Sequence, residues 1–179
     1  FPFSELRLLA SKRSAGKEIA FMGKTYTVEE ATFDSFKGID IALFAGGSIS
    51  KDFAPHAVKA GAVVIDNSSA FRMDPEVPLV VPEVNPQAIL KHKGIIANPN
   101  CSTIIMVMAL KPIYDLAKIK RVIVSTYQAV SGAGKEGIDE LDAQVREHSE
   151  GREMTANILP SASAEKHYPI AFNLIPQID

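Results

Sequence analysis

Apolar runs of strand length alternate with helical patterns and turn residues along the first hundred positions of the chain. These runs predict strands over 6–10, 39–45 and 62–66, and two short strands between residues 17 and 28 around a turn at Gly23-Lys24. The run over 39–45 is almost continuously apolar, as is typical of a parallel strand covered on both faces. The alternation predicts an α/β fold with helices on a parallel sheet.

Helices are expected in the intervals between these strands. One follows Gly46-Gly47-Ser48 and runs to Gly61, and a shorter one covers residues 87–93 before a strand end at 95–97. The apolar run over 103–110 predicts a further helix that lies wholly inside the protein.

The pattern changes beyond residue 100. Residues 121–130 are long enough for a strand of a second, larger sheet, and residues 136–150 place Ile138, Leu141 and Val145 on one helical stripe. We therefore expect a domain boundary here.

The boundary is predicted between residues 100 and 101. Residues 1–100 then form a nucleotide-binding type of fold, and residues 101–179 begin a second domain. The chain opens directly before an interior strand and stops without a charged or low-complexity tail. We expect both ends to be cut from a longer protein.

The composition is that of a globular protein, with 46% hydrophobic and 22% charged residues. A net charge of −2 gives no electrostatic argument for nucleic acid or an anionic membrane as partner. No apolar run approaches the roughly 20 residues of a membrane helix. A single cysteine forms no internal disulfide, so a cytoplasmic location is predicted.

The single cysteine, Cys101, lies between the strand end at 95–97 and the helix at 103–110. The free N–H groups and the dipole of a helix N-terminus favour an anion, and the thiolate is the nucleophilic form of cysteine. Cys101 is therefore a candidate nucleophile, with a small buried hydrophobe as the alternative interpretation.

Two turns are candidates for binding a dinucleotide. Arg13 and Ser14 directly follow the first strand, where the ribose of a dinucleotide lies in doubly wound folds. Arg with Ser suits a 2′-phosphate and favours NADP over NAD, whereas the alternative is a solvated basic turn. Gly46-Gly47 allows close approach of a phosphate, although two glycines also suit an ordinary turn.

Two further segments could contact a substrate. Arg72 is an isolated cation after the strand at 62–66, and it suits a phosphate or forms an ion pair with Asp74 or Glu83. Residues 128–134 are small and polar, so they leave room for a flat ring beside a nucleophile or form a plain turn. The four histidines are interpreted as structural, and no residue spacing predicts a metal site.

Six motifs in order carry a resemblance over nearly the whole chain, at 11–17, 66–72, 81–85, 98–103, 127–134 and 167–173 with 176–179. Together they resemble the bacterial aspartate-β-semialdehyde dehydrogenase family. The resemblance implies a Rossmann-like NADP-binding domain, incomplete at its N-terminus, followed by the start of an α+β catalytic and dimerisation domain.

Carried over to this sequence, the resemblance makes Cys101 the nucleophile that forms an acyl-thioester. Asn100 and Arg72 would hold phosphate, and Gln128 would orient the substrate beside the thiol. The family's catalytic histidine would lie beyond Asp179.

The resemblance also assigns cofactor contacts. Ser131 and Gly132 would touch the nicotinamide part of NADP, and Arg13 and Ser14 would hold the adenosine 2′-phosphate. The family's opening glycine loop would lie before Phe1, so the chain resembles the middle of the enzyme.

The implied reaction is the reversible reductive dephosphorylation of L-aspartyl 4-phosphate to L-aspartate 4-semialdehyde, in lysine, threonine and methionine biosynthesis. The resemblance implies a homodimer or homotetramer that takes a small-molecule substrate and inorganic phosphate. Two alternatives are N-acetyl-γ-glutamyl-phosphate reductase and a non-catalytic nucleotide-binding fragment. The first is disfavoured because its cysteine turn reads Gly-Cys-Tyr-Pro, whereas Cys101 lies in Asn-Cys-Ser-Thr.

Overall fold

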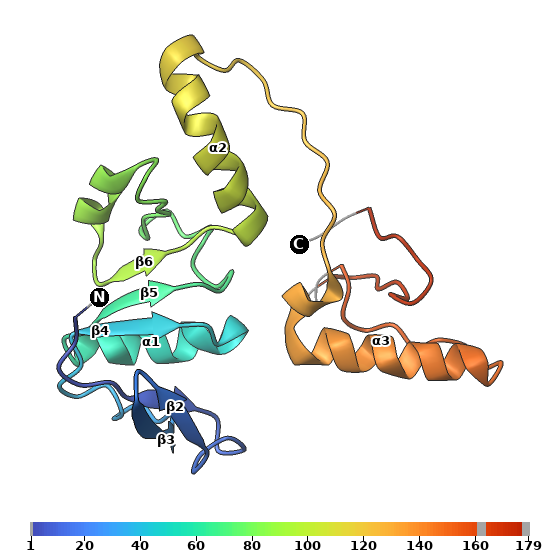
Figure 1. The fold of residues 1–179 in the computed structure, drawn as a ribbon, viewed down its shortest axis with the longest axis horizontal. Helices are drawn as coiled ribbons and strands as arrows, with labels where there is room; N and C mark the ends of the chain where they lie inside the picture. Colours follow the sequence, from blue (N-terminus) through green and yellow to red (C-terminus); the bar gives the residue numbers. More distant parts are fainter. Residues whose placement is uncertain (1, 161–163, 177–179) are drawn as a thin grey trace. The chain divides into compact units, whose positions relative to one another are not determined.

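The computed structural model describes residues 2–160 and 164–176. The chain divides into two compact units, residues 1–121 and 122–179 (Figure 1). Residues 177–179, which end the last motif of the resemblance, lie outside the described residues. Each unit is described by itself.

The first unit contains a parallel three-stranded sheet in the order β4-β5-β6. Its strands are β4 (Ile41–Phe44), β5 (Val63–Asp66) and β6 (Ile95–Ala97). Between β4 and β5 the chain forms a 3-10 turn, η1 (Gly47–Ile49), and the helix α1 (Ser50–Lys59). This β-α-β order confirms the predicted α/β fold with a parallel sheet.

A second three-stranded sheet precedes it, in the order β1-β3-β2. Strands β2 (Glu18–Phe21) and β3 (Lys24–Glu30) form the expected antiparallel pair around Gly23, whose φ is +76°. Strand β1 (Leu8–Ala10) pairs with β3 in parallel. The turn that carries Arg13 and Ser14 therefore leaves the carboxyl end of a strand, as the sequence predicts.

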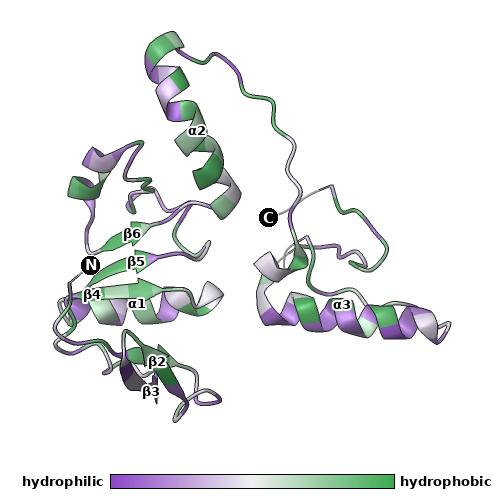
Figure 2. Cartoon of the chain, in the orientation of Figure 1, coloured by the Kyte–Doolittle hydropathy of each residue, from purple (hydrophilic) through white to green (hydrophobic). Residues whose placement is uncertain are grey.

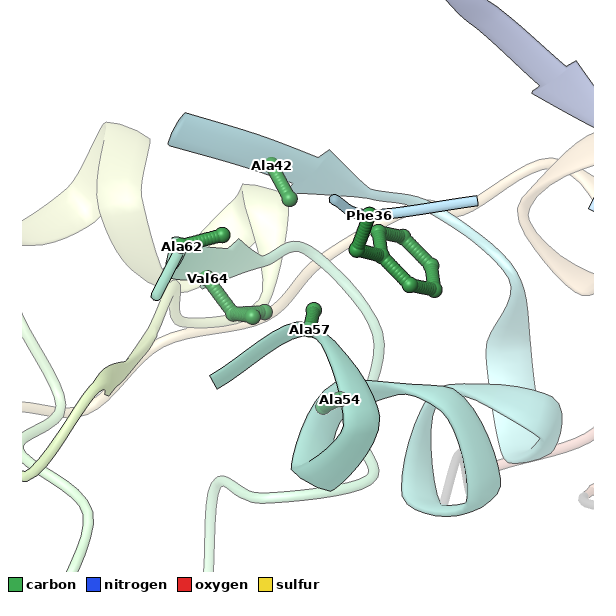
Figure 3. Close-up of a cluster of buried hydrophobic side chains, with 6 residues drawn as sticks. All are labelled: Phe36, Ala42, Ala54, Ala57, Ala62 and Val64. Atoms are coloured by element: carbon green, nitrogen blue, oxygen red, sulfur yellow. The ribbon is translucent and has the colours of Figure 1, made fainter. Parts of the chain in front are cut away.

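Small side chains let α1 pack closely on the sheet (Figure 3). Ala54 and Ala57 of α1 are fully buried, and they belong to one cluster with Val64 of β5. Phe36, Ala42 and Ala62 complete this cluster. The opposite face of β4 is not covered within the described residues, because Leu43 is 74% exposed. The expectation that both faces of this strand are buried is therefore wrong.

Helix α2 (Cys101–Ala117) begins where β6 ends. It is the apolar helix that the sequence predicts (Figure 2), but it has no fully buried residue, and Ile105 is 73% exposed. The prediction that this helix lies wholly inside the protein is wrong, because apolar composition alone does not supply a covering surface. None of the helices in the described part of the chain is long and apolar enough to cross a membrane.

No strand forms over residues 121–130. Val122, Ile123 and Val124 are exposed, and Ile123 is 85% exposed. A β-strand needs a partner for its backbone N–H and C=O groups, and the described residues of the second unit contain no strand that could pair with this segment. The strand prediction is therefore wrong for this structure.

The second unit is built around the helix α3 (Gly134–Ser149), which follows a 3-10 turn, η3 (Val130–Ala133). The expected stripe of Ile138, Leu141 and Val145 is not its buried face, because Ile138 and Val145 are exposed and Gly137 and Gln144 are buried. Polar side chains of α3 instead bond the segment that follows the helix.

Candidate active site

Three loops leave the carboxyl ends of β4, β5 and β6. In a parallel sheet these ends lie at one edge, and Figure 1 shows the three arrows pointing the same way. Ligands of open α/β sheets bind at this edge. The loops begin at Ala45, Asn67 and Asn98, so two of them contain the predicted Arg72 and Cys101.

Cys101 is the first residue of α2, and its side chain is exposed. Asn100 caps the helix, because its side-chain Oδ1 accepts hydrogen bonds from the backbone N–H groups of Ser102 at 3.0 Å and Thr103 at 3.3 Å. The thiol therefore lies at a capped helix start and is open to a ligand, so the interpretation as a small buried hydrophobe is wrong.

The cap also limits what Asn100 can offer to a ligand. Its Oδ1 is used by the helix, while its Nδ2 group donates to no residue that the structure describes. An amide N–H group is a donor, which suits an anion such as phosphate.

Arg72 is half-buried, and its guanidinium joins two loops. Its Nε donates to the carbonyl oxygen of Asn98 at 2.9 Å, and its Nη2 donates to the carbonyl oxygen of Asn67 at 3.0 Å. Nη1 has no partner among the described residues. The alternative of an ion pair with Asp74 or Glu83 is not found there either. One guanidinium edge therefore remains for an anion.

The side chains that connect and stabilise these loops are not among the site residues predicted from the sequence. Asn98 donates through Nδ2 to Oδ1 of Asn67 at 2.7 Å, and Ser68 donates to Oδ2 of the fully buried Asp66 at 2.6 Å. Their position in the sequence could have identified the asparagine pair, because Asn67 and Asn98 each come directly after one of two neighbouring parallel strands.

Arg13 and Ser14 lie in a turn after β1, where the backbone N–H of Ser14 donates to the carbonyl oxygen of Ser11 at 2.8 Å. Arg13 is exposed, and the described residues offer it no hydrogen bond or ion pair. An exposed guanidinium beside a hydroxyl at a strand's carboxyl end fits a phosphate group of a cofactor.

The remaining predicted residues belong to the second unit. Gln128 is exposed, and its Nε2 donates to Oγ1 of Thr126 at 3.2 Å. Ser131 and Gly132 are exposed in η3, directly before α3. Their roles beside Cys101 stay predictions. Among the described residues, no group of three or more His, Cys, Asp or Glu side chains could hold a metal ion.

Both parts of the chain match domains of a known protein family. Residues 1–92 match the NAD-binding domain of semialdehyde dehydrogenase, and residues 110–179 match the semialdehyde dehydrogenase dimerisation domain. This chain belongs to the semialdehyde dehydrogenase family. The Rossmann-like fold expected for its first part is confirmed, and a dimerisation domain follows it. The boundary predicted between residues 100 and 101 lies in an interval that neither match covers, so it stays a prediction.

Individual semialdehyde dehydrogenases resemble the chain along its whole length. It is 62% identical to aspartate-semialdehyde dehydrogenase of Aquifex aeolicus, with 100% of this chain and 52% of the relative covered. A crystal structure of aspartate semialdehyde dehydrogenase II from Vibrio cholerae, complexed with ASA, is 52% identical with a TM-score of 0.81, again covering 100% and 52%.

A more distant structure adds a cofactor. Aspartate semialdehyde dehydrogenase with NADP from Candida albicans is 27% identical with a TM-score of 0.51, over 64% of this chain and 40% of that one. The chain spans about half the length of the relatives it matches.

Proposed function

We propose that this chain carries the nucleophile of an NADP-dependent aspartate-semialdehyde dehydrogenase. The proposed reaction is the reversible reductive dephosphorylation of L-aspartyl 4-phosphate to L-aspartate 4-semialdehyde. The main supporting observation is Cys101, an exposed thiol at the first position of α2, on a turn that the Arg72 guanidinium joins to the neighbouring loop. The names of the similar enzymes support the choice of substrate.

In the first step, the Cys101 thiolate attacks the acyl carbon of L-aspartyl 4-phosphate. A carbon–sulfur bond forms, the bond from carbon to the phosphate oxygen breaks, and phosphate leaves with that electron pair. The Nη1 group of Arg72 and the Nδ2 group of Asn100 are the free donors proposed to bind the phosphate. The backbone N–H of Cys101 is proposed to stabilise the developing oxyanion, because the next two N–H groups of α2 already donate to the Asn100 cap.

In the second step, the thioester is reduced and Cys101 is released. NADPH, held by the residues proposed below, would supply a hydride to the thioester carbon, and the carbon–sulfur bond would then break to give the aldehyde and the Cys101 thiolate. Gln128 is proposed to orient the substrate beside the thiol.

Cofactor binding is assigned to residues of both units. Arg13 and Ser14 are proposed to hold the 2′-phosphate, which makes NADP the preferred cofactor. Ser131 and Gly132 are proposed to contact the nicotinamide part. The NADP-bound relative supports this choice.

The setting follows from the proposed reaction. We place the enzyme in the cytoplasm, in lysine, threonine and methionine biosynthesis, as a homodimer through its dimerisation domain or as a homotetramer. Inorganic phosphate is a substrate in the oxidative direction.

The test is turnover by the full-length protein that contains this sequence. With aspartate semialdehyde and phosphate it should reduce NADP. Cys101→Ser should abolish that reduction while NADP binding is kept, because a serine hydroxyl is a much weaker nucleophile at neutral pH than a thiol, part of which is ionised. N-acetylglutamate semialdehyde serves as the competing substrate. Turnover of that aldehyde alone would identify an N-acetyl-γ-glutamyl-phosphate reductase, and turnover by the serine variant would remove Cys101 from the nucleophile role.

A further inference from the structure

The turn that carries Cys101 is held by an amide pair, Asn67 and Asn98, which we call the amide staple. Asn98 Nδ2 donates to Asn67 Oδ1 at 2.7 Å, across the loops that follow β5 and β6. Asn67 also bonds β4, because its backbone N–H and its Nδ2 both donate to the carbonyl oxygen of Phe44, at 2.8 and 3.3 Å. The staple therefore joins the carboxyl ends of three strands.

The connection from the staple to the nucleophile is short and stiff. Asn98 is three residues before Cys101, so their Cα atoms are at most roughly 11 Å apart. Between them lies the buried Pro99, whose ring fixes its own φ and restricts Asn98 to extended conformations. Asn100 is fixed by its cap to the first turn of α2. A displacement of Asn98 is thus transmitted to the thiol.

The same staple reaches the cation assigned to phosphate. Arg72 donates to the carbonyl oxygens of both staple residues, through Nε to Asn98 and through Nη2 to Asn67. The staple, Arg72 and the Cys101 turn therefore form one hydrogen-bonded assembly, in which the amide pair sets the spacing between two loops.

We propose that Asn67 and Asn98 are positioning residues: their amide pair fixes the Cys101 turn relative to Arg72, so that the thiol meets the acyl carbon while the phosphate is held. This inference rests on the proposed function. Neither side chain needs to touch the substrate. Loss of the pair should slow chemistry and leave the thiol intact, because a misplacement of about 1 Å costs on the order of a hundredfold in rate.

The variant that tests this is Asn98→Ala in the full-length enzyme. It removes only the Nδ2 bond, because the backbone bonds from Asn98 N–H to Asp66 and from Arg72 to Asn98 do not involve the side chain. We expect kcat for phosphate-dependent NADP reduction to fall about tenfold or more. The KM for NADP and the rate of Cys101 alkylation by iodoacetamide should stay within about twofold of the wild-type values.

Asn85→Ala is the matched control. Asn85 accepts from the backbone N–H of Val81 at 2.8 Å and donates to the carbonyl oxygen of Leu79 at 3.0 Å, so its loss removes amide hydrogen bonds from the same unit without affecting the staple. Both variants should lower the melting temperature, but only Asn98→Ala should lower kcat. The double variant Asn67→Ala/Asn98→Ala should be no slower than the slower single variant. Both single variants lose the same Asn67–Asn98 bond, and the further bond from Asn67 Nδ2 to Phe44 is lost equally in Asn67→Ala and in the double variant.

Two results would overturn the inference. One is a kcat for Asn98→Ala within about twofold of wild type together with a lower melting temperature, which would make the pair merely structural. The other is fully additive losses in the double variant. Both leave the proposed function standing, since the wild-type enzyme turns over. A wild-type enzyme without phosphate-dependent NADP reduction overturns the proposed function, and this inference with it.

Discussion

At the scale of single residues, the candidate site depends on how many donors each side chain has left after it has bonded the protein. Arg72 uses two of its groups on backbone carbonyls, and Asn100 uses its oxygen on the helix start. The groups left over on Arg72 and Asn100 are both hydrogen-bond donors, so this part of the site favours anions. Lysine could not replace Arg72, because an ammonium lacks the planar fork that spans two carbonyls.

Arg72→Leu should raise the KM for phosphate in the oxidative direction by about ten- to a hundredfold, because one charge-assisted hydrogen bond is worth roughly 1.5–3 kcal/mol. Affinity for NADP should stay nearly unchanged. Initial rates at varied phosphate measure the effect. Arg72 also joins two loops, and a lysine would keep the positive charge without joining them. Arg72→Lys is therefore the control that separates the charge from the structural role. A phosphate KM that both variants leave unchanged while the melting temperature falls would make Arg72 purely structural.

Arg13→Ala should weaken NADP about ten- to a hundredfold while changing NAD little, since only NADP offers a 2′-phosphate for the guanidinium. Isothermal titration with both cofactors checks this. Lys12→Ala, in the same turn, is the matched control for loss of a positive charge. Equal losses for the two cofactors after Arg13→Ala would assign Arg13 a structural role.

At the scale of elements, close packing of α1 on the sheet constrains the connection before β6. Gly94 has a φ of +102°, and a Cβ atom there would lie 2.5 Å from Cγ1 of Val58. Gly61 has almost the same φ, +101°, but a Cβ atom there would meet nothing within 4 Å. A substitution at Gly61 therefore tests backbone strain alone, whereas the same substitution at Gly94 tests backbone strain together with steric overlap.

Gly61→Ala should destabilise the protein by about 1–3 kcal/mol through backbone strain alone. Gly94→Ala should add roughly 1–3 kcal/mol for the overlap with Val58. Urea unfolding of both variants measures the difference. Equal losses would mean that Val58 moves aside without cost.

How much of the fold is predictable differs between elements. The β2–β3 pair, α1, β5 and the start of α2 follow from local signals, because periodicity and glycine or asparagine turns act within a few residues. The segment 121–130 was predicted wrongly because a strand depends on a partner that the segment itself does not encode. The burial of α2 was also predicted wrongly, because it depends on a packing surface that the helix sequence does not encode.

In the candidate site too, features set by local sequence are predictable, and features that depend on distant residues are not. The position of Cys101 at a helix start follows from the strand-turn-helix pattern, and the ordered motifs point to Arg72 and Asn100. The hydrogen bond from Arg72 to Asn98 could not be predicted, because its acceptor is a backbone carbonyl 26 residues away. A carbonyl has no side-chain signature in a sequence.

At the scale of the whole molecule, each of the two units is stabilised by a different kind of interaction. The first has an apolar cluster between helix and sheet, whereas in the second the buried Gln144 bonds backbone groups far along the chain. Its Nε2 donates to the carbonyl oxygen of Thr155 at 2.6 Å, and its Oε1 accepts from the N–H groups of Ile170 at 2.7 Å and Ala171 at 3.0 Å.

Gln144→Ala should destabilise the second unit by about 3 kcal/mol, since each backbone group left without its partner costs roughly 1–3 kcal/mol and water satisfies part of the loss. Hydrogen exchange should accelerate at the amides of Ile170 and Ala171. Gln87→Ala, at an exposed glutamine, is the control and should change neither. Unchanged exchange in Gln144→Ala would show that these amides are protected by other contacts.

The exposed run Val122-Ile123-Val124 has a consequence for handling the protein in solution. Short β-branched segments with little charge are templates for intermolecular cross-β pairing. Concentrated samples of this chain should therefore aggregate through this run, and Ile123→Lys should delay the onset of light scattering. Leu174→Lys, at a leucine that is 86% exposed elsewhere in the second unit, adds the same charge and should delay it less. Equal delays would mean that net charge alone, and not this run, governs colloidal stability.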